Sequence, residues 1–198
     1  MDIVLKKVHK SFDGLPLFTG LDLTIKEGVI TCMTGRSGLG KTTLLRMLMG
    51  LDAPDSGSIL GLEGTKFSAV FQEDRLCEAL SASANAAIAL KKGCSRDASD
   101  NILRSLGLSE DLTKPVSELS GGMRRRVAIA RALAAEYDVL LLDEPFTGLD
   151  AECRDTALGV IKCLSEGKTV VLVSHDREIP LLAGGECIDL DALLPSQM

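Results

Sequence analysis

A glycine-rich segment near the start of the chain has residue types and spacing suited to binding phosphate: Gly35-Arg36-Ser37-Gly38-Leu39-Gly40-Lys41-Thr42. It matches the pattern G-x-x-x-x-G-K-[ST], in which glycines let main-chain N–H groups close around a polyphosphate. We expect Lys41 to reach the β- and γ-phosphates of a bound polyphosphate and the Thr42 hydroxyl to bind Mg²⁺. Thr43 extends the predicted nucleotide contact by one residue. A merely flexible glycine turn is the alternative, but the predicted strand before the segment and the predicted helix after it favour the phosphate loop.

Two adjacent carboxylates follow an apolar run further along the chain. Residues 139–142, Val-Leu-Leu-Leu, are typical of a buried strand, and this strand ends at Asp143 and Glu144. Ligands of open parallel sheets bind at the carboxyl ends of the strands. We therefore expect Asp143 to hold Mg²⁺, directly or through water, and Glu144 to orient the attacking water or accept its proton. A solvated strand end is the alternative for such a pair alone; the phosphate loop favours the catalytic interpretation.

A third segment combines a hydroxyl with bare backbone at the start of a predicted helix: Leu119-Ser120-Gly121-Gly122-Met123-Arg124-Arg125-Arg126-Val127. The Ser120 hydroxyl and the N–H groups of Gly121 and Gly122 can close on a phosphate, because a helix N-terminus favours anions. A plain helix cap with a glycine turn is the alternative. The segment closely resembles the LSGGQ signature of ATP-binding cassettes, the ABC family, and like that signature it precedes the acidic pair by a helix and a loop.

The resemblance covers nearly the whole chain and implies roles for four further residues. Phe12 stands where the family stacks an aromatic ring on adenine, although an aromatic near a strand is also commonly a core residue. Gln72 stands where the family's glutamine meets metal and water. Asp150, in the sequence Gly-Leu-Asp, corresponds to the D-loop and is expected near the nucleotide. His175 matches the switch histidine that contacts the γ-phosphate; a purely structural histidine is the alternative.

The resemblance also implies partners. In this family two cassettes dimerise head to tail, and each ATP lies between the phosphate loop of one copy and the signature of the other. We therefore expect a second copy of the chain, held by ATP and released by hydrolysis, and integral membrane permease subunits that form the pathway. The surface from Gln72 to about Leu90 is expected to receive their coupling helices. Relatives that act in DNA repair and chromosome maintenance carry long coiled coils between the phosphate loop and the signature, whereas here one short segment without heptads joins Gln72 to Ser120.

Two short segments are similar in sequence to importers of the nitrate, sulfonate and taurine group. They are residues 70–76, Val-Phe-Gln-Glu-Asp-Arg-Leu, and the pair Met123-Arg124. Those importers usually continue with a Leu-Pro-Trp type of turn, where Cys77-Glu78-Ala79 stands here. The expected function is therefore an ATPase that energises import of a small solute. The alternative is a non-transport cassette that drives or signals to an envelope or exporter complex. A catalytically silent binding module is disfavoured, because no hydrolytic residue is missing.

These residues require an α/β scaffold, and the hydrophobic pattern predicts one. We predict strands over residues 3–5, 21–25, 29–33, 66–71, 139–142 and 169–173, and helices over residues 41–49, 122–136 and 151–165. Their alternation predicts a mainly parallel sheet covered on both faces, and the resemblance implies a RecA-like P-loop NTPase core with an N-terminal antiparallel β part. Residues 73–119, rich in Ala, Ser and Leu, are predicted to form a small helical subdomain. Residues 1–72 and 120–198 would then form the nucleotide-binding core of a single ABC ATPase domain, 1–198.

Composition limits the partners and the location. The chain has 198 residues, 45% of them hydrophobic, which is enough for one domain. Its net charge of -6 gives no general attraction to nucleic acid, so the three adjacent arginines are predicted to lie on a solvated helix face with salt bridges. No stretch approaches the ~18 apolar residues of a membrane span, and we expect a cytoplasmic protein, peripheral on the inner face of the cell membrane. The six scattered cysteines are predicted to be small buried residues rather than metal ligands or disulfides.

Overall fold

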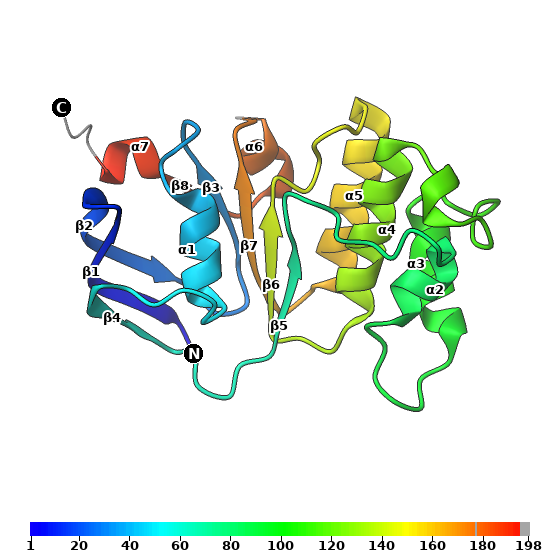
Figure 1. Ribbon diagram of the computed structural model, residues 1–198, viewed down its shortest axis with the longest axis horizontal. Coiled ribbons are helices and arrows are strands. Elements are labelled where there is room, and N and C mark those ends of the chain that lie inside the picture. Colours follow the sequence, from blue (N-terminus) through cyan, green and yellow to red (C-terminus); the bar gives the residue numbers. More distant parts are fainter. Residues whose placement is uncertain (177, 195–198) are drawn as a thin grey trace.

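The computed structural model describes residues 1–176 and 178–194, and its centre is a five-stranded sheet (Figure 1). In spatial order the strands are β5 (Phe67–Val70), β6 (Val139–Asp143), β7 (Thr169–Ser174), β3 (Ile30–Thr34) and β8 (Glu186–Asp189). All neighbours in this order run parallel. Parallel neighbours need crossover connections, and here helices form most of them. The predicted α/β class with a mainly parallel sheet is confirmed.

Both faces of this sheet are buried, which explains the unbroken apolar runs of its central strands. In β6, Leu140 and Leu142 belong to one hydrophobic cluster, whereas Val139 and Leu141 belong to the other. The residues of β7 divide between the same two clusters. A strand buried on both faces has no polar side to show, so its sequence does not alternate.

A second sheet is antiparallel and has the order β2-β1-β4. Its strands are β1 (Ile3–Phe12), β2 (Leu15–Ile25) and β4 (Ser56–Leu60). In β2, Leu21, Leu23 and Ile25 are buried while the residues between them are exposed, as in a strand with one face in the core. The expected N-terminal antiparallel part is therefore present. Its third strand, β4, was not predicted.

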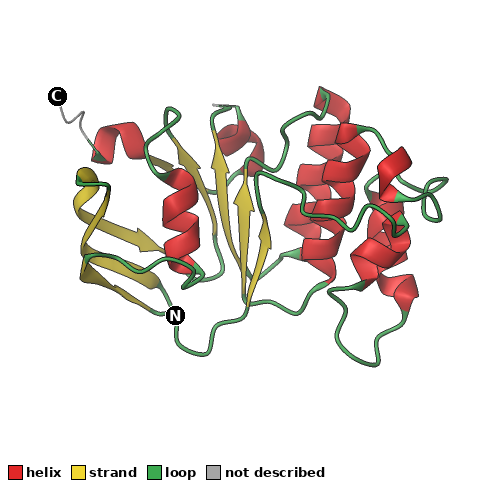
Figure 2. Cartoon of the chain, in the orientation of Figure 1, coloured by secondary structure: helices red, strands yellow, loops and turns green. Residues whose placement is uncertain are grey.

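Helices cover the two faces of the parallel sheet (Figure 2). Between the two sheets lies α1 (Lys41–Leu48), and the other face is covered by α4 (Gly121–Ala134), α5 (Ala151–Leu164) and α6 (Ile179–Ala183). Beyond α4 pack α2 (Ala82–Ala87) and α3 (Arg96–Ser105), and the remaining helices are a short 3₁₀ turn (Val116–Glu118) and α7 (Leu190–Leu193). None of the described helices is long and apolar enough to cross a membrane.

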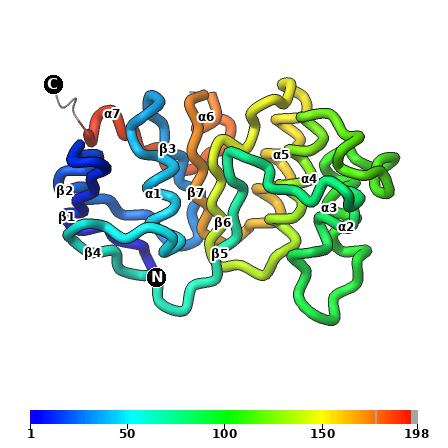
Figure 3. Tube along the Cα trace, in the orientation of Figure 1, coloured from blue at the N-terminus to red at the C-terminus, as the bar shows by residue number. Residues whose placement is uncertain are grey.

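The last described helix returns to the beginning of the chain, as the colours of Figure 3 show. Leu190 of α7 is buried in the same hydrophobic cluster as Phe18 of β2 and Met33 of β3. The next residue, Asp191, contacts the phosphate loop: its Oδ2 accepts the Arg36 N–H at 3.0 Å, and its Oδ1 pairs with the Arg36 Nε at 3.2 Å. The strand β8 and the helix α7, which were not predicted, therefore brace the loop from one side.

The cysteines are mostly exposed, contrary to the prediction. Only Cys32 is buried, whereas Cys77, Cys94, Cys163 and Cys187 are exposed and Cys153 is half-buried. Cys32 lies on β3 inside the sheet, while the others lie on loops, on the helix α5 and on the edge strand β8. All six are free thiols in the structure. Burial raises the pKa of the Cys32 thiol to about 11, so this thiol stays protonated at neutral pH.

Candidate functional site

The carboxyl ends of four parallel strands bring most of the predicted site residues to one edge of the sheet. The phosphate loop follows β3, Gln72 follows β5, Glu144 follows β6 and His175 follows β7. This is the edge at which ligands of open α/β sheets bind. A cleft of about 380 Å³ opens there, and the predicted residues that line it are Phe12, Ser37, Gly38, Gly40, Lys41, Thr42, Thr43, Gln72, Asp143 and Glu144. Leu17, which was not predicted, lines it as well.

The phosphate loop joins β3 directly to the N-terminus of α1. Gly40, the residue before the helix, has φ 85°, and a Cβ added there would lie 2.7 Å from side-chain atoms of Leu17 and Phe18. Glycine is therefore required at this position for both its conformation and its size. The loop ends at a helix N-terminus beside the cleft, where free N–H groups and the helix dipole favour anions.

Lys41 is folded back over the loop that precedes it. Its Nζ donates to the main-chain oxygens of Gly35 at 2.5 Å and of Arg36 at 3.0 Å. Phosphate oxygens are stronger acceptors for an ammonium group, because both partners then carry charge. Gly35, Arg36 and Leu39 were also predicted to contact the nucleotide, but they are not among the described residues that line the cleft. Leu39 packs instead against the hydrophobic cluster around α1.

Thr42 and Asp143 meet within the cleft. The Thr42 Oγ1 donates a hydrogen bond of 2.7 Å to Asp143 Oδ2, and Asp143 is only 4% exposed. Burial raises the pKa of Asp143 above its ordinary value, and the hydrogen bond from Thr42 offsets this only in part. A hydroxyl and a carboxylate oxygen are the hard ligands that Mg²⁺ prefers. The pair therefore fits this cation, whose charge would relieve the cost of burying the carboxylate.

Glu144 stands between this cleft and His175. Its Oε2 lies 2.9 Å from His175 Nδ1 and accepts a longer hydrogen bond, 3.4 Å, from Ser174 Oγ. The Glu144 side chain is 16% exposed and that of His175 69%. Glu144 has φ 49°, a left-handed backbone conformation that is strained for a residue with a Cβ and is found preferentially at functional sites. Ser174 was not predicted, although it directly precedes His175 at the carboxyl end of β7.

The predicted signature residues and Asp150 lie outside the cleft. Ser120 caps α4 by accepting a main-chain N–H bond of 3.3 Å, and Asp150 caps α5 in the same way at 2.8 Å. Gly121 is the first residue of α4. A Cβ on Gly122 would lie 3.1 Å from the main-chain oxygen of Gly148, so the signature and the D-loop pack against each other. Within one copy of the chain, the structure does not bring these residues to the phosphate loop.

The three adjacent arginines do not share one solvated face, contrary to the prediction. Arg124 agrees with it, since its guanidinium pairs with Glu78 at 2.9 Å near the surface. Arg126 donates to a main-chain oxygen after α3 at 2.9 Å. Arg125, by contrast, is only 3% exposed and donates to main-chain oxygens on two loops beside the cleft. Successive helix residues point about 100° apart, so three in a row cannot share one face.

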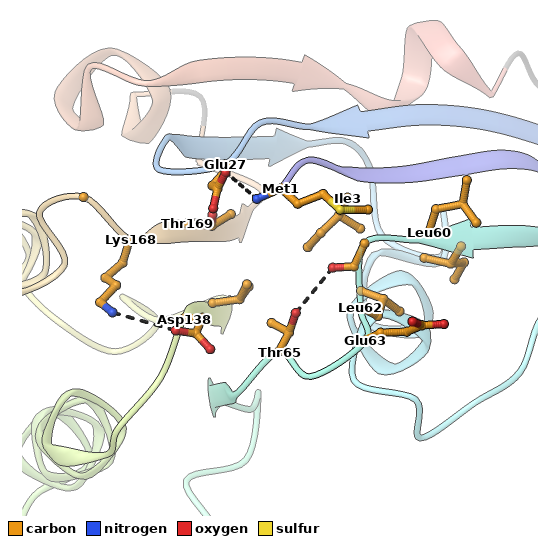
Figure 4. Close-up of a pocket in the computed structure, with 14 residues that line it drawn as sticks. Met1, Ile3, Glu27, Leu60, Leu62, Glu63, Thr65, Asp138, Lys168 and Thr169 are labelled. Carbon is orange, nitrogen blue, oxygen red and sulfur yellow. Dashed lines mark hydrogen bonds and ion pairs between the residues drawn. The ribbon is translucent and has the colours of Figure 1, made fainter.

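A wider cleft, of about 640 Å³, lies at the opposite end of the sheet (Figure 4). Aliphatic residues line it together with Glu27, Glu63, Asp138 and Lys168, at the amino ends of β6 and β7. The Lys168 Nζ lies 3.9 Å from Asp138 Oδ1. None of its described lining residues begins a helix, and acidic side chains outnumber basic ones there. This cleft is therefore poorly suited to a nucleotide, in spite of its size.

Comparison with known proteins gives matches along the chain. A family model described as ABC transporter matches residues 18–147. The chain is 38% identical over 193 residues to the spermidine/putrescine import ATP-binding protein PotA of Fusobacterium nucleatum, covering 89% of this chain and 51% of that protein. It is 36% identical over 205 residues to the aliphatic sulfonates import ATP-binding protein SsuB 1 of Agrobacterium fabrum, covering 96% and 74%. The chain spans about half the length of several curated relatives.

A solved structure shares both fold and sequence with the chain. It is the dimeric structure of a post-hydrolysis state of the ATP-binding cassette MJ0796, bound to ADP and Pi. The TM-score is 0.83 at 30% identity, and the alignment covers 94% of this chain and 93% of that one. The family match, over residues 18–147, includes the phosphate loop, Gln72, the signature and the acidic pair.

Proposed function

We propose that this protein is the ATP-binding and ATP-hydrolysing subunit of a transporter. The proposal starts from the family: the match of the ABC transporter family model to residues 18–147, most of the chain, shows that the chain belongs to this family. One observation carries the proposal: the phosphate loop, the Thr42–Asp143 pair and the Glu144–His175 pair meet at one edge of the sheet. These three groups suit a polyphosphate, a divalent cation and an attacking water, which are the requirements of phosphoryl transfer. The MJ0796 cassette bound to ADP and Pi supports hydrolysis as the reaction.

The protein's own residues account for each step of that reaction. Lys41 exchanges the loop carbonyl oxygens for the terminal phosphates of ATP. Thr42 and Asp143 would hold Mg²⁺, with Gln72 lining the same cleft, and a cation bound there would neutralise charge on the phosphates. Glu144 accepts a proton from the attacking water. An ionised carboxylate only accepts hydrogen bonds, so His175 Nδ1 carries the hydrogen and orients Glu144 Oε2.

The proposed nucleotide site is completed by a second copy of the chain. Ser120, Gly121, Gly122 and Asp150 lie apart from the phosphate loop of their own copy, which is the arrangement that a head-to-tail dimer requires. The dimeric state of the MJ0796 cassette supports this partner. ATP would then act as a reversible clamp, because it binds the closed dimer better than the separate copies.

The transported material is proposed to be a small solute that is imported. Both curated relatives described above are import ATP-binding proteins, one for spermidine and putrescine and the other for aliphatic sulfonates. The second is of the sulfonate class, to whose importers the sequence of residues 70–76 is similar. The two identities, 38% and 36%, are nearly equal, because cassettes share their nucleotide machinery rather than a solute site. The proposal therefore names the solute only by class.

The remaining parts of the proposal concern the place and the partners of the chain. We place residues 73–119 as a helical subdomain on a core of residues 1–72 and 120–198. Its surface, with the adjoining Gln72 loop, would receive integral membrane permease subunits. The chain would then act in the cytoplasm, peripheral on the inner face of the membrane and without a nucleic-acid partner.

The ATPase proposal is tested by phosphate release from the purified protein in ATP and Mg²⁺. The matched variant is Glu144→Gln, which keeps the shape of the side chain but cannot accept the proton. We expect turnover to fall by roughly 10²-fold or more while ATP binding persists. Wild-type turnover in this variant would remove Glu144 from the proposed mechanism, and no phosphate release from the wild-type protein would contradict the proposed enzyme.

The transporter proposal needs a separate experiment. Tagged Glu144→Gln protein is incubated with ATP and gently solubilised native membranes, and the captured proteins are identified by mass spectrometry. Recovery of a multi-spanning permease would support it. Recovery of an envelope or division protein without a pathway for solute would favour the non-transport cassette.

A further inference from the structure

We propose that Arg125 is a positioning residue for ATP hydrolysis, which locks the main chain at Gln72 to the main chain at Glu144. The inference rests on the proposed ATPase function and assigns to Arg125 no contact with the nucleotide. Its basis is a single buried guanidinium that joins two loops of the cleft. These loops follow different strands, β5 and β6, and are about seventy residues apart in the sequence.

The guanidinium of Arg125 uses all three of its nitrogens. Nη1 contacts the loop after β5, Nη2 contacts the end of β6 and the residue after it, and Nε contacts the next residue of that loop. The acceptors are the main-chain oxygens of Phe71 (2.6 Å), Gln72 (3.4 Å), Asp143 (2.8 Å), Glu144 (2.7 Å) and Pro145 (3.1 Å), and Oδ1 of Asp74 (3.0 Å). One rigid, planar group therefore sets the spacing between the two loops.

The charge of Arg125 is fully compensated, although the side chain is only 3% exposed. A buried charge is tolerated when it is paired and hydrogen-bonded. Asp74 supplies the opposite charge, and five carbonyl oxygens accept from the same guanidinium, that of Gln72 through a longer contact of 3.4 Å that shares a hydrogen of Nη1. Such a network holds its members in one arrangement, since moving either loop would leave buried donors and acceptors without partners.

The contact bears directly on how Glu144 is presented to the cleft. Glu144 has the strained φ of 49°, and both of its main-chain polar groups are fixed. Its N–H donates to the Val173 oxygen at 3.0 Å, and its C=O accepts from Arg125 at 2.7 Å and from the Thr147 N–H at 3.2 Å. The backbone held in this way aims the carboxylate toward His175, 2.9 Å away. Arg125 therefore acts on the proposed general base through the main chain.

A second arginine shows that Arg125 is not needed merely to attach the loop after β5 to α4. Arg131, also on α4, donates to the main-chain oxygens of Asp74 at 2.8 Å and of Arg75 at 2.7 Å. That loop is therefore fastened to α4 without Arg125. The distinct contribution of Arg125 is the link to residues 143–145, and with it the distance between Gln72 and Glu144.

The test compares Arg125→Lys and Arg125→Met with Arg104→Lys and Arg104→Met. Lysine keeps the charge opposite Asp74, but its single ammonium group cannot span both loops. Arg104 is an exposed arginine on α3, where its Nη1 donates to Asn101 Oδ1 at 2.7 Å. We measure kcat by phosphate release, ATP affinity with a fluorescent ATP analogue, and hydrogen–deuterium exchange along the chain.

We expect kcat to fall about tenfold in Arg125→Lys and up to about 10²-fold in Arg125→Met, because small displacements of catalytic groups have effects of this size. ATP affinity should change by less than about threefold, since a kcat loss with binding retained marks an interaction needed for the chemical step. Exchange should accelerate in peptides that cover residues 71–75 and 143–147 but not in the phosphate loop. Both Arg104 variants should match the wild type.

Two outcomes would overturn the inference: a kcat within twofold of wild type in folded Arg125→Lys, or unchanged exchange at residues 71–75 and 143–147. If Arg125→Met does not fold, Arg125→Lys decides. If the wild-type protein itself releases no phosphate, the proposed function fails, and the exchange data alone then decide whether Arg125 links the two loops.

Discussion

Asp143 carries a conflict between stability and binding that is confined to one side chain. It is 4% exposed, and burial raises the pKa of its carboxyl group. An ionised Asp143 is therefore disfavoured in the folded chain relative to the unfolded one. The same carboxylate, next to the Thr42 hydroxyl, is the proposed Mg²⁺ ligand. A cation bound there would offset the free-energy cost of burying the ionised carboxylate. Without Mg²⁺, the folded chain keeps that cost as a loss of stability for the sake of function.

We predict that Asp143→Asn makes the nucleotide-free protein more stable. The amide oxygen still accepts the Thr42 hydrogen bond, while the buried charge is gone. A gain of about 1 kcal/mol corresponds to a rise in Tm of roughly 2–4 °C for a chain of this size. Stabilisation by ATP and Mg²⁺ should be lost in the same variant, because the amide is a weaker ligand.

The measurement is thermal unfolding at pH 7 and at acidic pH, with Asp155→Asn, on the exposed surface of α5, as the control. Because the pKa of Asp143 is raised in the folded protein, this carboxylate takes up a proton at a higher pH in the folded wild type than in the unfolded chain. Lowering the pH through that raised pKa should therefore shrink the advantage of Asp143→Asn, since a protonated Asp143 is neutral too. An Asp143→Asn protein less stable than wild type at pH 7 would contradict this account.

At the scale of residues, the sequence predicts groups that are adjacent in the chain better than groups that meet only in space. The phosphate loop and the pair Asp143-Glu144 are contiguous, so their spacing alone indicates their chemistry. The sequence predicts a solvated face for Arg125 and its two neighbours, because they lie on a predicted helix of an acidic chain. The burial of Arg125 depends on which side of α4 meets the loops after β5 and β6, and no local pattern contains that information.

At the scale of elements, strands buried on both faces are predictable and edge strands are not. The runs in β6 and β7 contain four or more consecutive apolar residues, and both strands were predicted. Strand β4 begins Ser-Gly-Ser, which has low β-propensity, and it exists because β1 supplies a partner. Strand β8 has four residues and, among the described strands, pairs only with β3. Both depend on long-range pairing rather than on local sequence.

The start of α4 offers a prediction that separates a structural role from a functional one. Ser120 accepts the Met123 N–H at 3.3 Å and is the N-cap of this 14-residue helix. Replacing it with alanine removes the cap, whereas asparagine is as good an N-cap as serine. We predict a loss of about 1 kcal/mol, or a Tm lower by roughly 2–4 °C, for Ser120→Ala and almost no change for Ser120→Asn.

Both variants, however, should fail to associate in the presence of ATP, because both lack the Ser120 hydroxyl. If the Ser120 hydroxyl closes on the phosphate of a second copy, the longer asparagine does not fit there although it caps the helix. Thermal unfolding without nucleotide and sedimentation with ATP measure the two properties separately. If Ser120→Asn associates normally with ATP, Ser120 has only a structural role, as the N-cap of α4.

At the scale of the whole molecule, the proposed site is divided between two surfaces of one chain. The cleft of about 380 Å³ holds the phosphate loop and Glu144, while Ser120 and Asp150 cap helices outside it. The architecture of the single chain is largely predictable from alternating strands and helices. The division is not, because it follows from how α4 and α5 are docked on the sheet, and its purpose depends on a second copy.

The division leads to a prediction about association. Glu144→Gln protein should be monomeric without nucleotide and dimeric with ATP, because ATP then bridges two copies and is not consumed. ADP lacks the terminal phosphate that would reach the second copy, so it should leave the protein monomeric. Lys41→Ala in the same background should prevent the dimer by weakening the hold on that phosphate. Sedimentation equilibrium over a range of ATP concentrations measures this, and a Glu144→Gln protein that stays monomeric at saturating ATP would remove the second copy from the proposed site.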